Sequence, residues 1–129
     1  MSELKPVIKV LIAGSRCGCS QAKLDALVDA KLKGLNLKYR VVIVSGHANG
    51  IDKQGETYAT SRGYMIEYHV ANWDEKGKAA GHIRNAEMGS VANFGIIIWD
   101  YTSPGTRGMI VILRKKNIKH IVRHTKGMA

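Results

Sequence analysis

The chain alternates between short, continuous apolar runs and segments in which apolar residues recur every three or four positions. The apolar runs are rich in β-branched residues and have the length of strands, and most end at glycine or at polar residues, which is typical of buried strands. The five predicted strands are Val7–Ala13, Arg40–Ser45, Tyr64–Val70, Phe94–Trp99 and Ile118–Val122.

Helical spacing of apolar residues appears between the strands. In the first such segment Leu24, Val28 and Leu32 share one face, Ser20 can cap the helix and Gly34 can end it. The other predicted helices are Gly50–Arg62, Lys78–Ala92 and Thr106–Lys116, and polar loops are expected over Trp73–Gly77 and Asp100–Gly105.

Strands and helices therefore alternate from one end of the chain to the other. Apolar strands joined by helical connections favour a parallel sheet that helices cover on both faces. We expect an α/β fold, a Rossmann-like three-layer α/β/α sandwich with a mostly parallel five-stranded sheet. The length of 129 residues suits a single domain over residues 1–129.

The last predicted helix is apolar almost all round over Met109–Leu113. A helix of this kind usually needs burial on more than one side. We therefore expect a homo-oligomer that associates through Thr106–Lys116, with deep packing inside one subunit as the alternative.

The chain is strongly basic, with 20 Lys and Arg, 10 Asp and Glu and a net charge of +10. This charge suggests an anionic partner, either a nucleic acid or a phosphorylated small molecule, although a solvated basic surface would give the same composition. The basic residues are scattered along the sequence and base-stacking aromatics do not interleave with them, which weakens the case for single-strand binding.

Membrane and metal partners are not expected. No apolar run approaches the roughly 20 residues of a membrane span, and Met1–Pro6 lacks the apolar core of a signal peptide, so a cytoplasmic protein is expected. Cys17 and Cys19 are too close together for a disulfide between them to stabilise the fold, and two cysteines are too few for a closed zinc site.

Three glycine-containing loops follow predicted strands and lead into predicted helices: Gly14–Gly18, Ser45–Gly50 and Tyr101–Thr106. Ligands of open α/β sheets bind outside the carboxyl ends of the strands, where glycine allows close approach and helix N-termini offer N–H groups to phosphate. Taken singly, each of these glycines is equally explained as a turn residue after a strand. Neither a Walker A sequence nor a G-x-G-x-x-G fingerprint follows the first strand, so a dehydrogenase is not expected.

Several side chains near these loops are candidates for ligand contacts. Arg84 could pair with a phosphate through two hydrogen bonds, or it could be an ordinary surface arginine. Trp73 could cover a base or ribose, Tyr101 could stack on a base, and His47 could contact a ligand from the second loop. Asp52 could accept hydrogen bonds from a ribose, or it could only favour the N-terminal end of its helix dipole.

Four segments also match a known family: VLIAGSR (Val10–Arg16), VVIVSGHANGID (Val41–Asp52), ANWDEKGKAAGHIRNAEM (Ala71–Met88) and SPGT (Ser103–Thr106). The chain resembles the SLOG superfamily, named for the Smf/DprA and LOG (Lonely Guy) proteins, over roughly residues 7–122. It is most similar to the small YspA/YpsA-like branch found in bacteria and phages. The third segment is the most specific, with a Trp, a turn rich in Gly and Lys, and then Ala-Gly-x-x-Arg-Asn-x-x-Met.

The resemblance implies a Rossmann-like fold that binds a nucleotide or a nucleotide-derived ligand such as an ADP-ribose derivative. Apart from this ligand, the sequence indicates no definite cofactor. It also implies that Gly105 and Thr106 hold a phosphate. The lining residues that it implies are Gly14, Ser15, Arg16, Gly46, Asn49, Gly50, Asp52, Arg84, Asn85, Gly105 and Thr106.

The LOG enzymes, which release a base from a nucleoside monophosphate, differ from this chain at one decisive position. Arg84 aligns with an arginine that they use in catalysis, but of their motif Gly-Gly-x-Gly-Thr-x-x-Glu only Gly105-Thr106 is retained, and Met109 takes the glutamate position. Methionine can neither move a proton nor stabilise an oxocarbenium-like sugar. This favours a binder that senses or sequesters its ligand over an enzyme.

Two alternatives stay open. The first is a nucleotide N-glycosidic hydrolase that uses Arg84 together with a carboxylate in place of the missing glutamate. The candidates for this carboxylate are Asp52, Asp74, Glu87 and Asp100. The second is a DNA-binding protein of the Smf/DprA type, which the net charge would suit.

Overall fold

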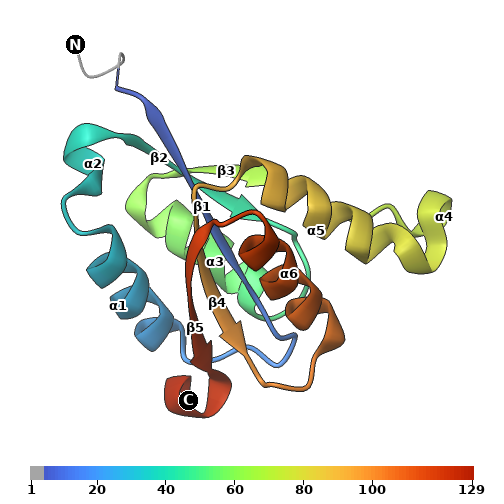
Figure 1. Cartoon of the computed structure of the whole chain (residues 1–129). Helices are drawn as coiled ribbons and strands as arrows, with labels where there is room; N and C mark the ends of the chain where they lie inside the picture. Colours follow the sequence, from blue (N-terminus) through green and yellow to red (C-terminus); the bar gives the residue numbers. More distant parts are fainter. Residues whose placement is uncertain (1–4) are drawn as a thin grey trace.

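A single five-stranded parallel sheet forms the centre of the molecule in the computed structural model, which describes residues 5–129 (Figure 1). Its strand order is β3-β2-β1-β4-β5, and every strand pair is parallel, so the sheet is fully rather than mostly parallel. The strands are β1 (Val7–Gly14), β2 (Arg40–Ser45), β3 (Met65–Tyr68), β4 (Phe94–Trp99) and β5 (Lys119–His124).

Helices cover both faces of the sheet. They are α1 (Gln21–Leu32), α2 (Leu35–Lys38), α3 (Ile51–Arg62), α4 (Trp73–Lys76), α5 (Ala80–Val91) and α6 (Pro104–Lys115), with 3-10 turns η2 (Gly77–Ala79) and η3 (Thr125–Met128). Helices α1 and α3 pack on one face, and α5 and α6 pack on the other. The predicted Rossmann-like three-layer sandwich is confirmed.

The central strand β1 contributes side chains to the hydrophobic cores on both faces of the sheet. Its side chains alternate between the two faces, as in any strand, so Val10 and Ile12 enter the core under α1 and α3 while Leu11 and Ala13 enter the core under α5 and α6. All four are buried. A continuous apolar run is therefore what a central parallel strand requires.

Two helical turns differ from the sequence prediction. The loop predicted over Trp73–Gly77 is wrong, because Asn72 accepts a hydrogen bond from the backbone N–H of Glu75 and so caps the short helix α4. Helix α2 was not predicted. In addition, α6 begins at Pro104 rather than Thr106, since proline suits the first turn, where its missing N–H is not needed.

Helix α6 buries its apolar side chains within the subunit. Met109, Ile110 and Leu113 are buried, while Val111 is exposed. Helix α5 approaches α6 closely at Gly89, where a Cβ atom would lie 2.4 Å from Cγ2 of Ile112. Packing inside one subunit thus buries most of the apolar side chains of α6.

The α4–α5 segment, residues 73–91, extends away from the sheet and carries α4 at its outer end (Figure 1). Helix α5 packs against α6 near its C-terminal end, at Met88 and Gly89. Over residues 5–129, every helix is too short or too polar to cross a membrane.

Candidate functional site

A cavity of about 620 Å³ opens at the carboxyl edge of the sheet. Four segments surround it: the loop after β1, the start of α3, the α4–α5 segment and the loop that leads into α6. Nine predicted site residues line it, namely Gly14, Ser15, Arg16, Asp52, Trp73, Arg84, Asn85, Gly105 and Thr106. Most of the predicted site residues therefore come together at this one cavity.

The floor of the cavity is made of tightly packed backbone. A Cβ atom at Gly14 would lie 1.9 Å from the carbonyl oxygen of Ile98 in β4, so only glycine fits there. The next residue, Ser15, is buried; its N–H donates to Ile98 O at 3.0 Å and its Oγ accepts from the N–H of Asp100 at 2.9 Å. These contacts join the loops after β1 and β4.

The loop after β2 is held against the loop after β1. Gly50 has a left-handed backbone with φ of 82°, and a Cβ atom there would lie 2.4 Å from the carbonyl oxygen of Arg16. The N–H of Ile51 donates to Ser15 O at 3.2 Å. Gly50 does not line the cavity, and its contribution is to let the two loops touch.

Asp52 presents a buried carboxyl group to the cavity, with only 4% of its surface exposed. Its Oδ2 accepts from the N–H of Ala48 at 3.2 Å. Burial raises the pKa of Asp52 to about 6, although the N–H groups of Ala48 and Gly14 and the charge of Arg84 act in the opposite direction. This carboxyl group can therefore hold or release a proton near neutral pH.

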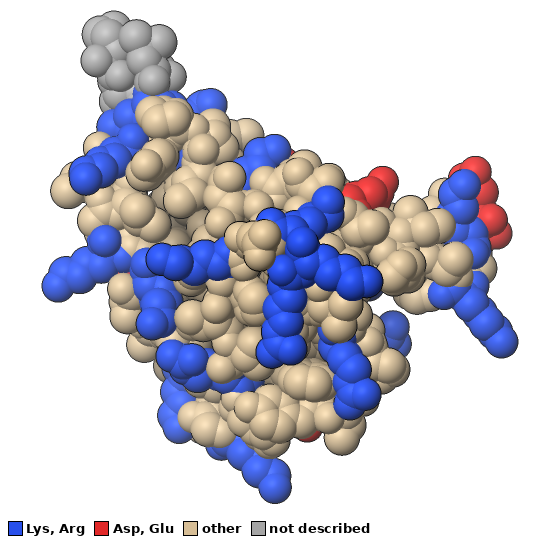
Figure 2. All heavy atoms as spheres, viewed as in Figure 1, with Lys and Arg blue, Asp and Glu red and all other residues tan. Residues whose placement is uncertain are grey.

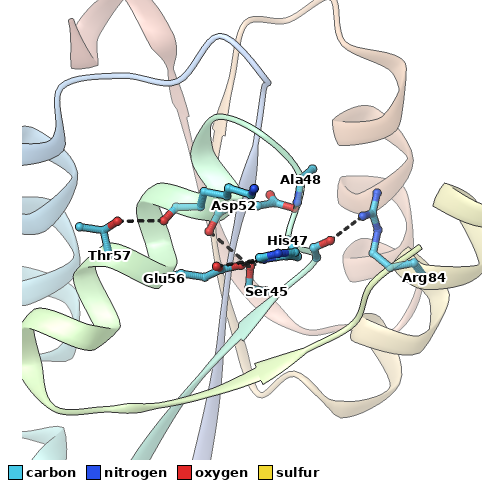
Figure 3. Close-up of polar contacts among 9 residues, drawn as sticks. Ser45, His47, Ala48, Asp52, Glu56, Thr57 and Arg84 are labelled. Atoms are coloured by element: carbon cyan, nitrogen blue, oxygen red, sulfur yellow. Dashed lines mark hydrogen bonds and ion pairs between the residues drawn. The ribbon is translucent and has the colours of Figure 1, made fainter. Parts of the chain in front are cut away.

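Arg84 reaches from α5 toward the loop after β2 (Figure 3). Its Nη1 donates to the carbonyl oxygen of Gly46 at 2.8 Å, and its Nε donates to Oδ1 of Asn85 at 3.0 Å. Within residues 5–129, Nη2 makes no hydrogen bond, so this donor remains available. Burial lowers the pKa of Arg84, Asp52 raises it, and the nearby charge of Arg16 lowers it. Two neighbouring guanidinium groups favour an anion between them.

Helix α6 points its N-terminus at the same cavity. The Nδ2 group of Asn85 donates to the carbonyl oxygen of Gly105 at 3.1 Å and so fixes the first turn of α6 against α5. The N–H groups of Gly105 and Thr106 have no hydrogen-bond partner in the described part of the chain, as expected in the first turn of a helix. Thr106 itself is buried and lines the cavity.

Asp100 does not place its charge on the free N–H groups of α6. Its carboxylate accepts from the N–H groups of Thr102 and Ser103 and from the hydroxyl of Ser103, all at 2.8 or 2.9 Å. These hydrogen bonds hold the pKa of Asp100 well below its usual range. The first turn of α6 therefore keeps its capacity for an anion.

Trp73 lies at the open side of the cavity, on α4. Half of its surface is exposed, and its indole ring packs on the first turn of α5, where a Cβ atom at Gly81 would lie 3.2 Å from Cη2. Trp73 therefore lines the cavity with a side chain that packs against α5 and is half exposed.

Four predicted residues lie outside the cavity lining: Gly46, His47, Asn49 and Gly50. His47 turns away, with its Nδ1 2.9 Å from Oε2 of Glu56, which also accepts from the hydroxyl of Ser45 at 2.6 Å (Figure 3). Gly46 supports the site from behind, because a Cβ atom there would lie 2.7 Å from Oδ2 of Asp52.

Lys78 and His82 line the cavity and were not predicted as site residues. They add an amine and an imidazole on the side of the α4–α5 segment. Together with Asn85 they fall at i, i+4 and i+7, a spacing that places side chains on one helix face and could have revealed them.

The described residues 5–129 contain no cluster of three or more His, Cys, Asp or Glu side chains that could hold a metal ion. Cys17, at the cavity, and Cys19, behind it, are free thiols. The arrangement suits an anionic organic ligand.

Comparisons with known proteins give one similar sequence. No protein-family model matches the chain, and no solved structure matches it. The chain is 36% identical over 86 residues to the Gene 61 protein of Mycobacterium phage D29, an alignment that covers 62% of this chain and 66% of the phage protein. The chain is therefore similar to a protein encoded by a mycobacteriophage.

Proposed function

We propose that this protein binds a nucleotide or a nucleotide-derived ligand, such as an ADP-ribose derivative, in the cavity at the carboxyl edge of the sheet. The observation that carries the proposal is the first turn of α6, whose unpaired N–H groups at Gly105 and Thr106 open into a cavity that Arg16 and Arg84 also line. A helix N-terminus flanked by guanidinium groups is a strong site for phosphate.

The rest of the cavity suits the other parts of such a ligand. Asp52 offers a carboxyl group that can accept hydrogen bonds from ribose hydroxyls, and Trp73 offers a half-exposed ring at the entrance for a base. A volume of about 620 Å³ is within the range of ordinary small-molecule sites.

Membership of the SLOG superfamily is part of this proposal, because the motifs quoted above supply most of the cavity lining. The biological role would be to sense or to sequester the ligand. The similarity to a phage protein agrees with the occurrence of the YspA/YpsA-like branch in phages.

The proposal is tested by thermal-shift measurements with AMP, ADP, ATP, NAD and ADP-ribose. A ligand present at 100 times its dissociation constant should add about 2.7 kcal/mol to the free energy of unfolding, which raises the melting temperature measurably. If none of these ligands shifts the melting temperature, the proposal fails.

Hydrolysis of an N-glycosidic bond is a second candidate function, which the buried carboxyl group of Asp52 favours. Met109 lines the cavity but has no proton to transfer, whereas Asp52 titrates near pH 6 beside Arg84. Incubation of each bound ligand, followed by chromatography for released base, separates an enzyme from a binder.

Self-association through α6 also remains a proposal. The surface that α6 leaves free contains Val111 between Arg107 and Arg114. Sedimentation velocity tests it: a dimer that Val111→Glu dissociates would support an interface on α6, and a monomer at all concentrations would exclude it.

A further inference from the structure

His47 lies outside the cavity lining, but the peptide groups on either side of its Cα atom both serve the cavity. The carbonyl oxygen of Gly46, in the peptide group before His47, accepts from Nη1 of Arg84 at 2.8 Å. The N–H of Ala48, in the peptide group after it, donates to Oδ2 of Asp52 at 3.2 Å. Each peptide group is planar, so the backbone angles of His47 set how the groups that hold Arg84 and Asp52 are oriented relative to each other.

The backbone of His47 is left-handed, with φ of 60°. Residues with a Cβ atom rarely adopt this region, although histidine does so more often than most. Such a conformation persists only where surrounding contacts hold it. The orientation of the two peptide groups therefore depends on what the N–H and the side chain of His47 contact.

Three contacts hold His47, and none of the partners lines the cavity (Figure 3). The N–H of His47 donates to Oγ of Ser45 at 3.1 Å, and its Nδ1 lies 3.0 and 2.9 Å from the two carboxylate oxygens of Glu56. Its ring meets the ring of Tyr68 edge to face, with 5.4 Å between the centroids. Glu56 also accepts from the hydroxyl of Ser45 at 2.6 Å. This carboxylate therefore links the two side chains that hold the backbone of His47.

We propose that the His47–Glu56 pair is a positioning element of the nucleotide site. By holding the backbone of His47, Glu56 orients the carbonyl group that binds Arg84 and the N–H group that binds Asp52. The proposal rests on the nucleotide-binding function proposed above, in which Arg84 meets a phosphate and Asp52 meets a ribose. It gives His47 and Glu56 an effect on affinity without any contact to the ligand.

The other end of the same loop is anchored separately. A Cβ atom at Gly50 would lie 2.4 Å from the carbonyl oxygen of Arg16, and the N–H of Ile51 donates to the carbonyl oxygen of Ser15 at 3.2 Å. Loss of the His47–Glu56 pair should therefore change the orientation of the two peptide groups while the loop stays attached to the fold.

Two variants of Glu56 separate its contacts from its charge. Glu56→Ala removes the carboxylate and both of its contacts, whereas Glu56→Gln removes the same charge but keeps an oxygen and an amide group for Ser45 and His47. Both variants are expected to fold, because alanine and glutamine are good helix formers. The Ser45 hydroxyl also keeps an acceptor, since it lies 3.3 Å from the carbonyl oxygen of Asp52.

The first measurement is the affinity for ADP-ribose by isothermal titration calorimetry. We expect Glu56→Ala to bind ADP-ribose roughly three- to tenfold more weakly than the parent, the effect of about one hydrogen bond, and Glu56→Gln to bind at least as tightly as the parent. A loss in Glu56→Ala that Glu56→Gln does not share would report the lost contacts.

The charge of the molecule makes this loss diagnostic. The chain carries a net charge of +10, and Figure 2 shows Lys and Arg spread over the face in view, with the acidic side chains in view mainly on the α4–α5 segment and beside it. Removal of one more acidic charge should favour an anionic ligand. Weaker binding by Glu56→Ala would therefore run against the electrostatic effect of the substitution.

The titration of Asp52 in the free protein tests the same positioning without a ligand. Burial raises the pKa of Asp52, the N–H of Ala48 and the charge of Arg84 lower it, and the charge of Glu56 raises it. Both variants lose the charge of Glu56, but only Glu56→Ala also releases the groups that lower the pKa. The midpoint of Asp52, followed by NMR of its carboxyl carbon, should therefore lie at higher pH in Glu56→Ala than in Glu56→Gln.

Equal Asp52 midpoints in the two variants would overturn the proposal, because the contact of Glu56 would then have no effect on the cavity. Equal affinities of Glu56→Ala and the parent for ADP-ribose would also overturn it. If the parent binds none of the nucleotides while the Asp52 midpoints still differ, the nucleotide site fails and the positioning of Asp52 by the His47–Glu56 pair stands.

Discussion

Arg84 donates from Nη1 to the carbonyl oxygen of Gly46 at 2.8 Å and so joins α5 to the loop after β2. The two residues are 38 positions apart in the chain. Through its Nε the same guanidinium fixes Asn85, which in turn holds the first turn of α6. One side chain thus positions three walls of the cavity, and this makes it the most informative residue to change.

Replacement of Arg84 by lysine should weaken nucleotide binding while the charge is kept. Lysine cannot reproduce two hydrogen bonds in fixed directions, and loss of a charge-assisted hydrogen bond of about 1.5–3 kcal/mol corresponds to roughly ten- to a hundredfold in affinity. Isothermal titration calorimetry with the tightest ligand of the thermal-shift screen measures the change.

Arg62→Lys is the matched control for Arg84→Lys, because Arg62 pairs with Asp29 on the opposite face of the sheet. It should bind the ligand like the parent. Equal affinity in Arg84→Lys and the parent would show that Arg84 serves the fold and not the ligand.

Thr106→Val should lower affinity by a few fold to about tenfold, the value of one neutral hydrogen bond, with little change in melting temperature. The substitution removes a hydroxyl from the cavity and keeps the shape of the side chain. Thr57→Val is the control, since Thr57 is exposed on α3 and bonds only to its own helix. A phosphate subsite at α6 is contradicted if both variants bind equally well.

Asp52→Asn should stabilise the protein above pH 6. The folded pKa of Asp52 is about 6, above the usual value of 3.8, so the folded state favours the protonated form. The stability from this group is therefore full below about pH 4 and is lost as the pH rises through 6, by about 3 kcal/mol in total. Urea unfolding of both proteins between pH 4 and 8 measures the difference, which should vanish at the acidic end.

Gly89→Ala should destabilise the fold by about 1–3 kcal/mol, because the new methyl group would overlap Ile112 of α6. Gly108→Ala is the matched control: it also lies within a helix, but a Cβ atom there meets no other atom within 4 Å, so it should stabilise the protein by roughly 0.5–1 kcal/mol. Thermal unfolding of the two variants should therefore differ in sign. A stable Gly89→Ala protein would mean that α5 and α6 can move apart at little cost.

The sequence predicted all five strands because burial on both faces leaves a continuous apolar run, as in Phe94–Trp99. It missed α4, since a four-residue helix has no apolar periodicity and depends on the cap at Asn72. The orientation of His47 could not be predicted from the sequence either. Its ring turns away from the cavity because it pairs with Glu56, which lies on α3.

The close contact at Gly89 has a mechanical consequence. Helix α5 is held against α6 near its C-terminal end, while its N-terminal half, which follows α4, forms one wall of the cavity. Nine residues separate Gly89 from Ala80, which is about 14 Å of helix. Gly89 is therefore a pivot point for α5: a tilt of this helix by about 10° at Gly89 displaces its N-terminal end by about 2 Å. A small adjustment between two packed helices is enough to change the width of the entrance.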